Sequence, residues 1–401
     1  MARAKVRLTV TGVAAGGDGI ARGPDGRVVF VEGAIPGDEV VAEVLAERRD
    51  YLRAKVDEVL GESSDRVDAP CPEVERGCGG CQWQHVEAGA QQRLKAVIVA
   101  DALRRLAHIE GPVASGPPIA PAGYRTTLHL AVDADGRACF RRRRGHELVN
   151  VASCLVAHPL LAELVVSGRY RGASEVTLRV GARTGERLVY ARPVTATVEV
   201  PADVTIARRA GDFLHERAAG RRWRISAGSF FQSGPEAAET LSAAVGRAVG
   251  DTLSAGGHLL DAYCGVGLLG GSLVAGSIDE TVSLTAVEAV PLSAADASAN
   301  LADLRARVVT AEVAEVDAWR AAPVDVVVAD PARPGLGPSA SAALASTRAG
   351  LIVLVSCDPA SLARDAVLLG GHGYRLASVE VVDLFPHTFH VETVSRFELV
   401  G

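Results

Sequence analysis

The sequence lacks long apolar stretches and is poor in aromatic residues. None of its apolar runs approaches the roughly 20 residues that a membrane-spanning helix requires. The first six residues alternate charged and small side chains, without the apolar core of a signal peptide. Only 4% of the residues are aromatic although 48% are hydrophobic, so Ala, Val and Leu must build the cores. We expect a cytoplasmic globular protein that does not enter membranes, and its 401 residues allow two or three domains.

The chain also lacks the excess of basic residues with which some proteins bind nucleic acid by charge alone. Its formal net charge is −6, which argues against such binding. Nucleic acid could still bind to a local basic patch, and the candidates are the arginine-rich residues 141–144 and 221–224. Taken alone, a run of four arginines is more often a solvated edge than a nucleic-acid site.

The N-terminal 60 residues alternate short β-like runs with glycine-rich turns. The runs are residues 6–10, 27–31, 38–44 and 51–56, and a turn with three glycines lies at 16–19. Short strands at close, regular spacing are typical of a small β-barrel. We therefore predict a barrel domain over residues 1–60.

Three cysteines follow closely on one another after this segment. Cys71, Cys78 and Cys81 form a C-x6-C-x2-C array, with Pro and Gly residues that let the backbone wrap around a centre. In a reducing compartment such clustering indicates a metal site rather than disulfides. Cys154 is the best candidate for a fourth ligand, and His85 or His158 are alternatives if the metal is zinc. Thiolates suit either zinc or an iron–sulfur cluster, and the spacing does not separate the two.

Residues 61–228 have the pattern of an α+β domain. Residues 87–108 have helical periodicity, and we expect this helix to pack against the sheet that follows it. Residues 124–132, 137–141, 175–180 and 187–190 read as strands of that sheet. Cys139 lies within a predicted strand and is expected to be a core residue.

Residues 229–401 alternate strands and helices, which predicts a doubly wound sheet and an overall α/β fold class. The first strand leads into Gly265-x-Gly267, a turn that lets backbone approach a ligand at a helix N-terminus. Glu288 follows the next strand, where a carboxylate can accept both ribose hydroxyls of a nucleoside cofactor. Asp330 ends the third strand. The Gly-x-Gly turn alone is weak evidence, and together with Glu288 it supports a nucleoside-binding site as well as it supports a structural turn.

Cys357 follows the apolar run 351–355 and precedes a turn into a helix. Ligands and chemistry collect at the carboxyl edge of such sheets, and a helix N-terminus favours the anionic form of a thiol. The alternative is that Cys357 is simply a small buried apolar residue. If the last strand runs antiparallel, its start brings Glu392 to the same edge as Cys357, Asp330 and Glu288.

The motifs, taken in order, resemble those of a known family. They are Phe230-Phe-Gln232, residues 261–267 (Asp-Ala-Tyr-Cys-Gly-Val-Gly), Asp330-Pro-Ala-Arg333, Ser356-Cys-Asp-Pro359 with residues 362–365, and His390-Val-Glu392. Residues 19–22, Phe30 and 33–40 resemble a TRAM domain, an OB-like barrel attached to RNA-modifying enzymes. With the cysteine array, the chain resembles over nearly its whole length the class I S-adenosylmethionine-dependent RNA uracil-5-methyltransferases that carry a TRAM domain and an iron–sulfur cluster. Within that family it is most similar to the branch acting on large-subunit ribosomal RNA.

The resemblance implies roles for particular residues. Cys357 would add to C6 of a flipped uracil, which makes C5 attack the sulfonium methyl group, and Glu392 would then remove the C5 proton. The residues implied to hold S-adenosylmethionine are Gln232, Tyr263, Glu288 and Asp330, and those implied to hold a [4Fe-4S] cluster are Cys71, Cys78, Cys81 and Cys154. The partner would be RNA, and we expect a monomer.

Three departures from the family pattern stand out. Leu268 and Asp358 each replace a common Asn, and the spacing from Cys71 to Cys78 is one residue longer than usual. Alternative hypotheses are the same chemistry on transfer RNA, an inactive RNA-binding protein, a methyltransferase acting on cytosine C5, and a redox protein that uses the cluster.

Overall fold

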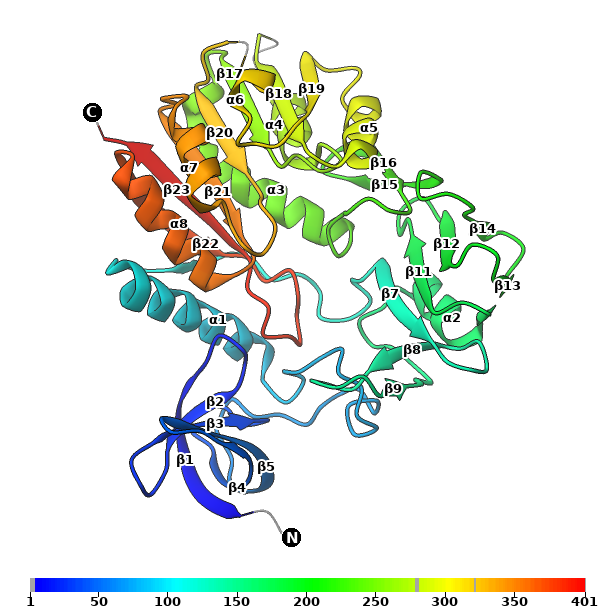
Figure 1. Cartoon of the computed structure of the whole chain (residues 1–401), viewed down its shortest axis with the longest axis vertical. Helices are drawn as coiled ribbons and strands as arrows, with labels where there is room; N and C mark the ends of the chain where they lie inside the picture. The colour runs from blue at the N-terminus through cyan, green and yellow to red at the C-terminus, as the bar shows by residue number, and fades with distance from the viewer. Residues whose placement is uncertain (1–3, 278–280, 321, 401) are drawn as a thin grey trace.

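The N-terminal segment forms a closed five-stranded barrel. A computed structural model describes residues 4–277, 281–320 and 322–400, and Figure 1 shows the barrel below the rest of the chain. Its strands are β1 (Lys5–Val13), β2 (Gly19–Arg22), β3 (Val28–Glu32), β4 (Glu39–Glu47) and β5 (Tyr51–Gly61), in the order β1-β2-β3-β5-β4. Alternate residues such as Leu8, Val10, Val29 and Val31 fill the interior, as the period of two requires. The predicted barrel is confirmed.

A second sheet forms the centre of the chain. Its strands are β7 (Thr127–Val132), β8 (Ala138–Arg141), β9 (Leu148–Val149), β11 (Glu175–Val180), β12 (Arg187–Arg192) and β14 (Thr205–Ile206), in the order β14-β12-β11-β7-β8-β9. Helix α2 (Pro159–Ser167) packs Leu161 and Leu164 against one face of this sheet. Two short ribbons accompany it, β10 (Arg169–Arg171) with β13 (Thr197–Glu199) and β15 (Phe213–Ala218) with β16 (Arg221–Ser226). Cys139 is buried in β8, as predicted.

The C-terminal part contains an eight-stranded sheet in the order β19-β18-β17-β20-β21-β23-β22-β6. Five strands are parallel: β17 (His258–Ala262), β18 (Ser283–Glu288), β19 (Ala306–Thr310), β20 (Val326–Ala329) and β21 (Leu351–Ser356). β23 (Thr393–Leu399) runs antiparallel to both β21 and β22 (Tyr374–Val381). β6 (Ala114–Ser115), from before the central sheet, adds to the edge beside β22.

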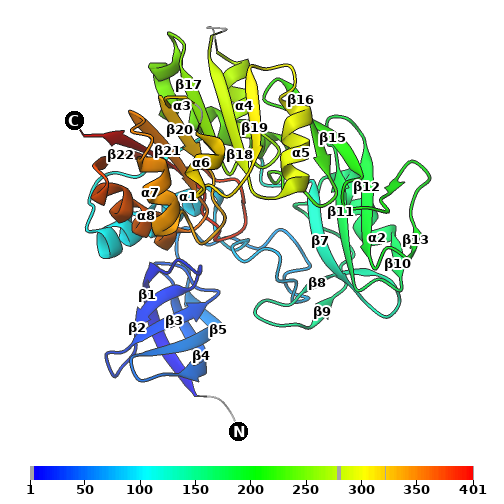
Figure 2. The ribbon, with the colours of Figure 1, turned by 45° about the horizontal axis from the view of Figure 1, so that its top comes forward.

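Helices cover both faces of this sheet, which explains why its central strands are continuous apolar runs (Figures 1 and 2). One face packs α3 (Pro235–Val249) and α4 (Leu268–Ala275), and α5 (Pro291–Asn300) lies beside β16. The other packs α6 (Val316–Trp319), α7 (Gly337–Ala345) and α8 (Pro359–Gly371). The predicted α/β fold class is therefore confirmed. Within the described ranges, none of the helices combines the length and apolar character that crossing a bilayer requires.

Helix α1 (Ala88–Ala102), which continues into a π-helical turn at Leu103–Ala107, is placed differently from our expectation. It packs against α8 and β22 of the C-terminal sheet, where Leu94 and Ile98 share a core with Leu362 and Leu369. The prediction that it packs on the central sheet is wrong. The physical reason is that the buried side of α1 meets apolar side chains of α8, whereas the central sheet packs its apolar side chains against α2.

The turn between β1 and β2 attaches the barrel to the rest of the chain. The indole Nε1 of Trp83 donates to the carbonyl of Gly17 (3.0 Å). Asp18, which is 4% exposed, accepts from the guanidinium groups of Arg143 (3.0 Å) and Arg144 (2.7 Å). Part of the arginine run 141–144 is therefore neither a solvated edge nor a free patch, because two of its members hold the barrel.

The packing of the β1–β2 turn against the rest of the chain can be tested at Gly17. Its φ is +79°, and a Cβ atom built there lies 2.6 Å from Cβ of Phe389, whereas a Cβ on Gly16 meets nothing within 4 Å. We expect Gly17→Ala to lower the free energy of unfolding by about 1–3 kcal/mol, because it adds backbone strain and overpacking. Gly16→Ala is the matched control and should unfold like the wild type in thermal denaturation. Equal stability of the two variants would contradict this packing.

Candidate functional site

Four predicted site residues lie at one edge of the C-terminal sheet. The parallel strands β17, β18, β20 and β21 end there, so Tyr263, Glu288, Asp330 and Cys357 follow at their carboxyl ends. β23 runs the opposite way, with Thr393 paired to Ser356, so Glu392 begins at the same edge. The expectation about the direction of the last strand is confirmed, and it brings Glu392 beside Cys357.

The turn after β17 is tightly organised around Glu288. One carboxylate oxygen of Glu288 accepts from the backbone N–H of Gly265 (2.9 Å) and the other from that of Val290 (2.7 Å). Gly265 and Gly267 have φ of +56° and +88°, which glycine adopts without strain, and Tyr263 also has a positive φ of +63°. A non-glycine residue held in this region often marks a functional turn. The second lone pairs of the Glu288 oxygens are free to accept hydroxyl donors.

Gln232 lies on the segment that joins β16 to α3. It is buried, and its neighbour Ser233 donates its hydroxyl to the carbonyl of Leu384 (3.1 Å). The carbonyl of Ser233 accepts from the backbone N–H of Thr126. Gln232 is therefore adjacent in sequence to a residue that joins the start of the central sheet to the segment leading to Glu392.

Asp261 is a buried carboxyl that sequence reasoning assigned no role. Its Oδ2 accepts from the backbone N–H of Gly270 (2.8 Å), while its Oδ1 has no partner. Burial raises its pKa to about 7, and the nearby carboxyls of Asp330 and Glu288 add to this effect. The available signal was an Asp within an apolar strand that leads into the Gly-x-Gly turn, since buried carboxyls are rare without a function.

The environment of Cys357 opposes the formation of a thiolate in the ligand-free protein. Burial raises the pKa of Cys357 to about 11, and the carboxyls of Glu392 and Asp330 act in the same direction, whereas Arg333 opposes them. The helix N-terminus favours the anionic form of this thiol, whereas burial and the two carboxyls act against it. Burial also raises the pKa of Asp330 to about 7 and that of Glu392 well above its ordinary range. A cation bound here would lower all three values.

Arg333 and His390 lie together beside Cys357. Nη2 of Arg333 donates to Nδ1 of His390 (3.4 Å), which requires a neutral imidazole. Burial and the charges of Arg333 and Arg125 lower the pKa of His390 to about 4, so this ring is neutral at physiological pH. Both residues occur in recognisable motifs, but the sequence alone gave no indication that they contact each other.

The four predicted metal-ligating cysteines line one cavity of about 360 Å³, together with Thr388 and His390 from the segment before Glu392. The cysteines are Cys71, Cys78, Cys81 and Cys154. Burial raises the pKa of Cys78, of Cys154 and of Cys81, the last to about 11. In the described part of the chain, no three or more His, Cys, Asp or Glu side chains form a ready site for a single metal ion.

Neither histidine considered as a fourth ligand lines this cavity. Nδ1 of His158 accepts from the backbone N–H of Leu160 and caps α2, while His85 is partly buried and its buried Nε2 has no hydrogen-bond partner. Cys154 itself lies in the turn before α2. The cavity is lined by the four thiols and also by Glu73, His129 and His390, but by neither His85 nor His158.

The second arginine-rich stretch, residues 221–224, serves contacts within the chain. Arg221 pairs with Asp303, Arg222 pairs with Glu186, and the guanidinium of Arg224 lies 4.2 Å from the ring centre of Phe213. The three arginines that we considered as a possible nucleic-acid patch are therefore engaged in contacts within the chain.

Comparisons with known proteins agree with this architecture. The model of the TRAM domain family matches residues 1–56. An RNA methyltransferase of Streptomyces avermitilis is 38% identical over 420 residues, which cover 96% of each chain, and one of Corynebacterium glutamicum is 31% identical over 99% of this chain and 97% of its own. The Pyrococcus abyssi tRNA (uracil-54, C5)-methyltransferase, solved with S-adenosyl-L-homocysteine, has the same fold, with a TM-score of 0.72 over 98% of this chain and 99% of its own at 23% identity. By its relation to these full-length relatives, the chain belongs to the RNA methyltransferase family.

Proposed function

We propose that this protein transfers a methyl group from S-adenosylmethionine to C5 of a uridine in RNA. The observation that carries the proposal is the meeting of Cys357 and Glu392 at one sheet edge, beside the Glu288 turn. A thiol, a carboxyl base and a nucleoside-binding turn are the three parts that this chemistry needs. S-adenosylmethionine, when bound, supplies the electrophilic methyl group.

The residues at the edge fit such a ligand. Glu288 is free to accept ribose hydroxyls, and Tyr263, Asp330 and Gln232 complete the proposed cofactor site. The Asp261 carboxyl is fully buried, Asp330 is partly buried, and the pKa of each is raised to about 7. A positively charged sulfonium nearby would lower both pKa values.

Each protein group then has a defined task in the reaction. Cys357 gives its proton to the carboxylate of Asp330, the other carboxyl beside it, so that Glu392 stays unprotonated. Sγ then bonds to C6 of the uracil, which puts electron density on C5. C5 takes the methyl group, and the Glu392 carboxylate removes the C5 proton. The Sγ–C6 bond then breaks and the thiolate leaves, so that a methyl group has replaced a proton. The raised pKa of Glu392 suits a base of this kind.

We propose large-subunit ribosomal RNA as the substrate, on the grounds of the barrel and the cysteine array. The test is nucleoside mass spectrometry by RNA species on cells with and without the gene. Loss of 5-methyluridine from large-subunit ribosomal RNA alone supports both the chemistry and the substrate. Loss from transfer RNA keeps the chemistry and replaces the substrate, and loss from neither contradicts both.

We further propose that Cys71, Cys78, Cys81 and Cys154 hold a [4Fe-4S] cluster. The convergence of four thiols on one cavity and the absence of His85 and His158 from its lining support this assignment. Protein purified without oxygen should contain iron and acid-labile sulfide in equal amounts. Stoichiometric zinc without sulfide would replace the cluster by a zinc site.

We treat residues 1–60 as the RNA-binding barrel, 61–228 as the cluster domain and 229–401 as the methyltransferase domain. In this proposal the enzyme acts as a cytoplasmic monomer. The pairing of β6 and the packing of α1 tie the second of these units closely to the third.

Replacing the proposed nucleophile separates chemistry from binding. Cys357→Ala should lower methyl transfer by ~10³-fold or more, because no covalent bond to C6 can form. S-adenosylmethionine binding, measured by calorimetry, should remain unchanged. Cys139→Ala is the control, since Cys139 is buried in β8 of the central sheet. Full activity of Cys357→Ala would refute the mechanism.

Replacing the proposed base should stop the reaction after methylation. Glu392→Gln keeps the shape of the side chain but cannot accept a proton, so turnover should fall by about 10²–10⁴-fold. A covalent enzyme–RNA adduct carrying the labelled methyl group should accumulate on denaturing gels. Glu398→Gln, at a partly exposed position of the same strand, should behave like the wild type. Normal turnover of Glu392→Gln without an adduct would exclude Glu392 as the base.

A further inference from the structure

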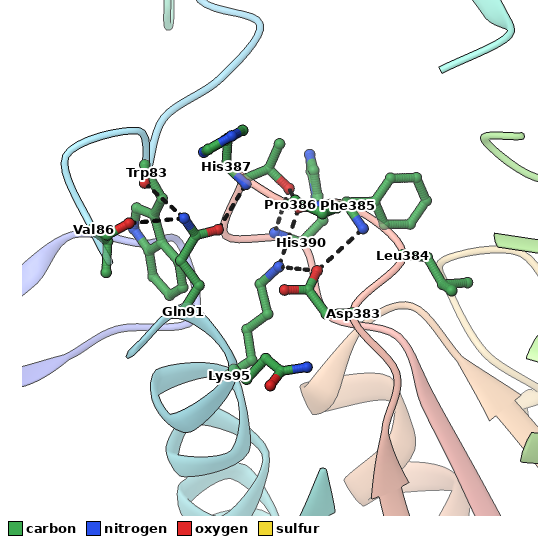
Figure 3. Close-up of polar contacts among 12 residues, drawn as sticks. Trp83, Val86, Gln91, Lys95, Asp383, Leu384, Phe385, Pro386, His387 and His390 are labelled. Carbon is green, nitrogen blue, oxygen red and sulfur yellow. Dashed lines mark hydrogen bonds and ion pairs between the residues drawn. The ribbon is translucent and has the colours of Figure 1, made fainter. Parts of the chain in front are cut away.

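A buried ion pair joins α1 to the segment that leads to Glu392. Lys95 on α1 is fully buried, and its Nζ lies 2.7 Å from Oδ1 of Asp383, which is 3% exposed. The same ammonium donates to the carbonyl of Phe385 (3.1 Å), as Figure 3 shows. The two partners are 288 positions apart in the sequence. None of the tasks in the proposed reaction uses this pair.

Asp383 lies at the neck of a long connection between β22 and β23. The backbone N–H of Val382 donates to the carbonyl of Glu392 (2.8 Å), so the two ends of the connection are joined. Asp383 is the next residue after Val382, and its Oδ1 also accepts from the backbone N–H of Phe385 (3.2 Å). Lys95 therefore holds the connection next to the point where Glu392 enters its strand.

A second contact, one helical turn earlier on α1, holds the middle of the connection. Oε1 of Gln91 accepts from the backbone N–H of His387 (2.7 Å), and its amide nitrogen donates to the carbonyls of Trp83 and Val86. The backbone N–H of Trp83 donates to the carbonyl of His387 (2.8 Å). His387 has a positive φ of +65°, a conformation that persists only when its surroundings enforce it. Gln91 and Lys95 face the same side of α1, as a spacing of four residues requires.

Net stability is a weak explanation for a buried ion pair. Removing two charges from water opposes folding, and well-packed apolar residues of similar size often do as well or better. What such a pair supplies is geometry, because its short bond and its additional hydrogen bond fix one arrangement of the backbone. Here the backbone that it fixes is bonded to Glu392.

We propose that Lys95 and Asp383 are positioning residues that hold Glu392 where it removes the C5 proton. The proposal rests on the proposed function and adds two residues to it that touch neither RNA nor S-adenosylmethionine. Cys357 is carried by β21, so its placement does not depend on the connection between β22 and β23. Loss of the pair should therefore slow proton removal and spare the addition of Cys357 and the methyl transfer.

RNA containing 5-fluorouridine separates these steps, because fluorine replaces the proton that the base removes. Trapping of the enzyme on such RNA requires thiol addition and methyl transfer but no base. The probes are transcripts of large-subunit ribosomal RNA and of transfer RNA, made with and without 5-fluorouridine. The double variant Lys95→Met with Asp383→Leu removes both charges and leaves neither buried without a partner.

We expect this double variant to be trapped on fluorinated RNA at the wild-type rate. On ordinary RNA its turnover should fall ~100-fold, as expected for a displaced catalytic group, and the methylated covalent adduct should accumulate. Arg93→Met is the matched control, because Arg93 lies on the same helix but pairs with Asp65 at the surface. It should resemble the wild type in both assays.

A uniform fall in both assays would mean general structural damage and would overturn the proposal, as would normal turnover on ordinary RNA. If the double variant does not fold, Gln91→Met decides the question, because it releases His387 without leaving a buried charge. It should show the same selective loss, and equal effects in both assays would again refute the idea. Failure of the wild type itself to be trapped or to form 5-methyluridine on either RNA would instead refute the proposed function.

Discussion

The antiparallel pairing of β23 with β21 is the constraint on which the site depends. The register that joins Thr393 to Ser356 leaves Cys357 and Glu392 as neighbours at the end of one strand and the start of the other. A fully parallel sheet would bring the start of the last strand to the opposite edge. The reversal therefore allows a thiol and a carboxyl to meet at one sheet edge, with the Glu288 turn at the same edge.

Burial gives this edge of the C-terminal sheet its electrostatic character. Asp261, Asp330 and Glu392 all have raised pKa values, and so does Cys357, because the low-dielectric interior disfavours each negative charge and they repel one another. An edge with several suppressed negative charges is complementary to a cationic ligand. The same physics raises the pKa of the Cys357 thiol, and a cation bound at this edge would lower it.

The sequence predicted those features that depend on local pattern. Apolar runs located the buried strands, and the rule that ligands bind at their carboxyl ends brought Glu288, Asp330 and Cys357 together. It did not predict the placement of α1, the pairing of Arg143 and Arg144 with Asp18, or the contact between Lys95 and Asp383. Each of these depends on which distant surface is left uncovered once the other elements have packed. The raised pKa of Cys357 was missed because only the helix, and not the burial and nearby carboxyls, was visible in the sequence.

The connection before Glu392 explains why one chain needs all three of its parts. Phe389 packs against Gly17 of the barrel, His390 and Thr388 line the cysteine cavity, and Lys95 of α1 holds the neck. The barrel, the wall of the cysteine cavity and α1 therefore all contact backbone that adjoins Glu392. If Glu392 is the base, as proposed, its supporting segment is complete only when the barrel and the cysteine domain are in the places described here. The placement of the base would then depend on these contacts.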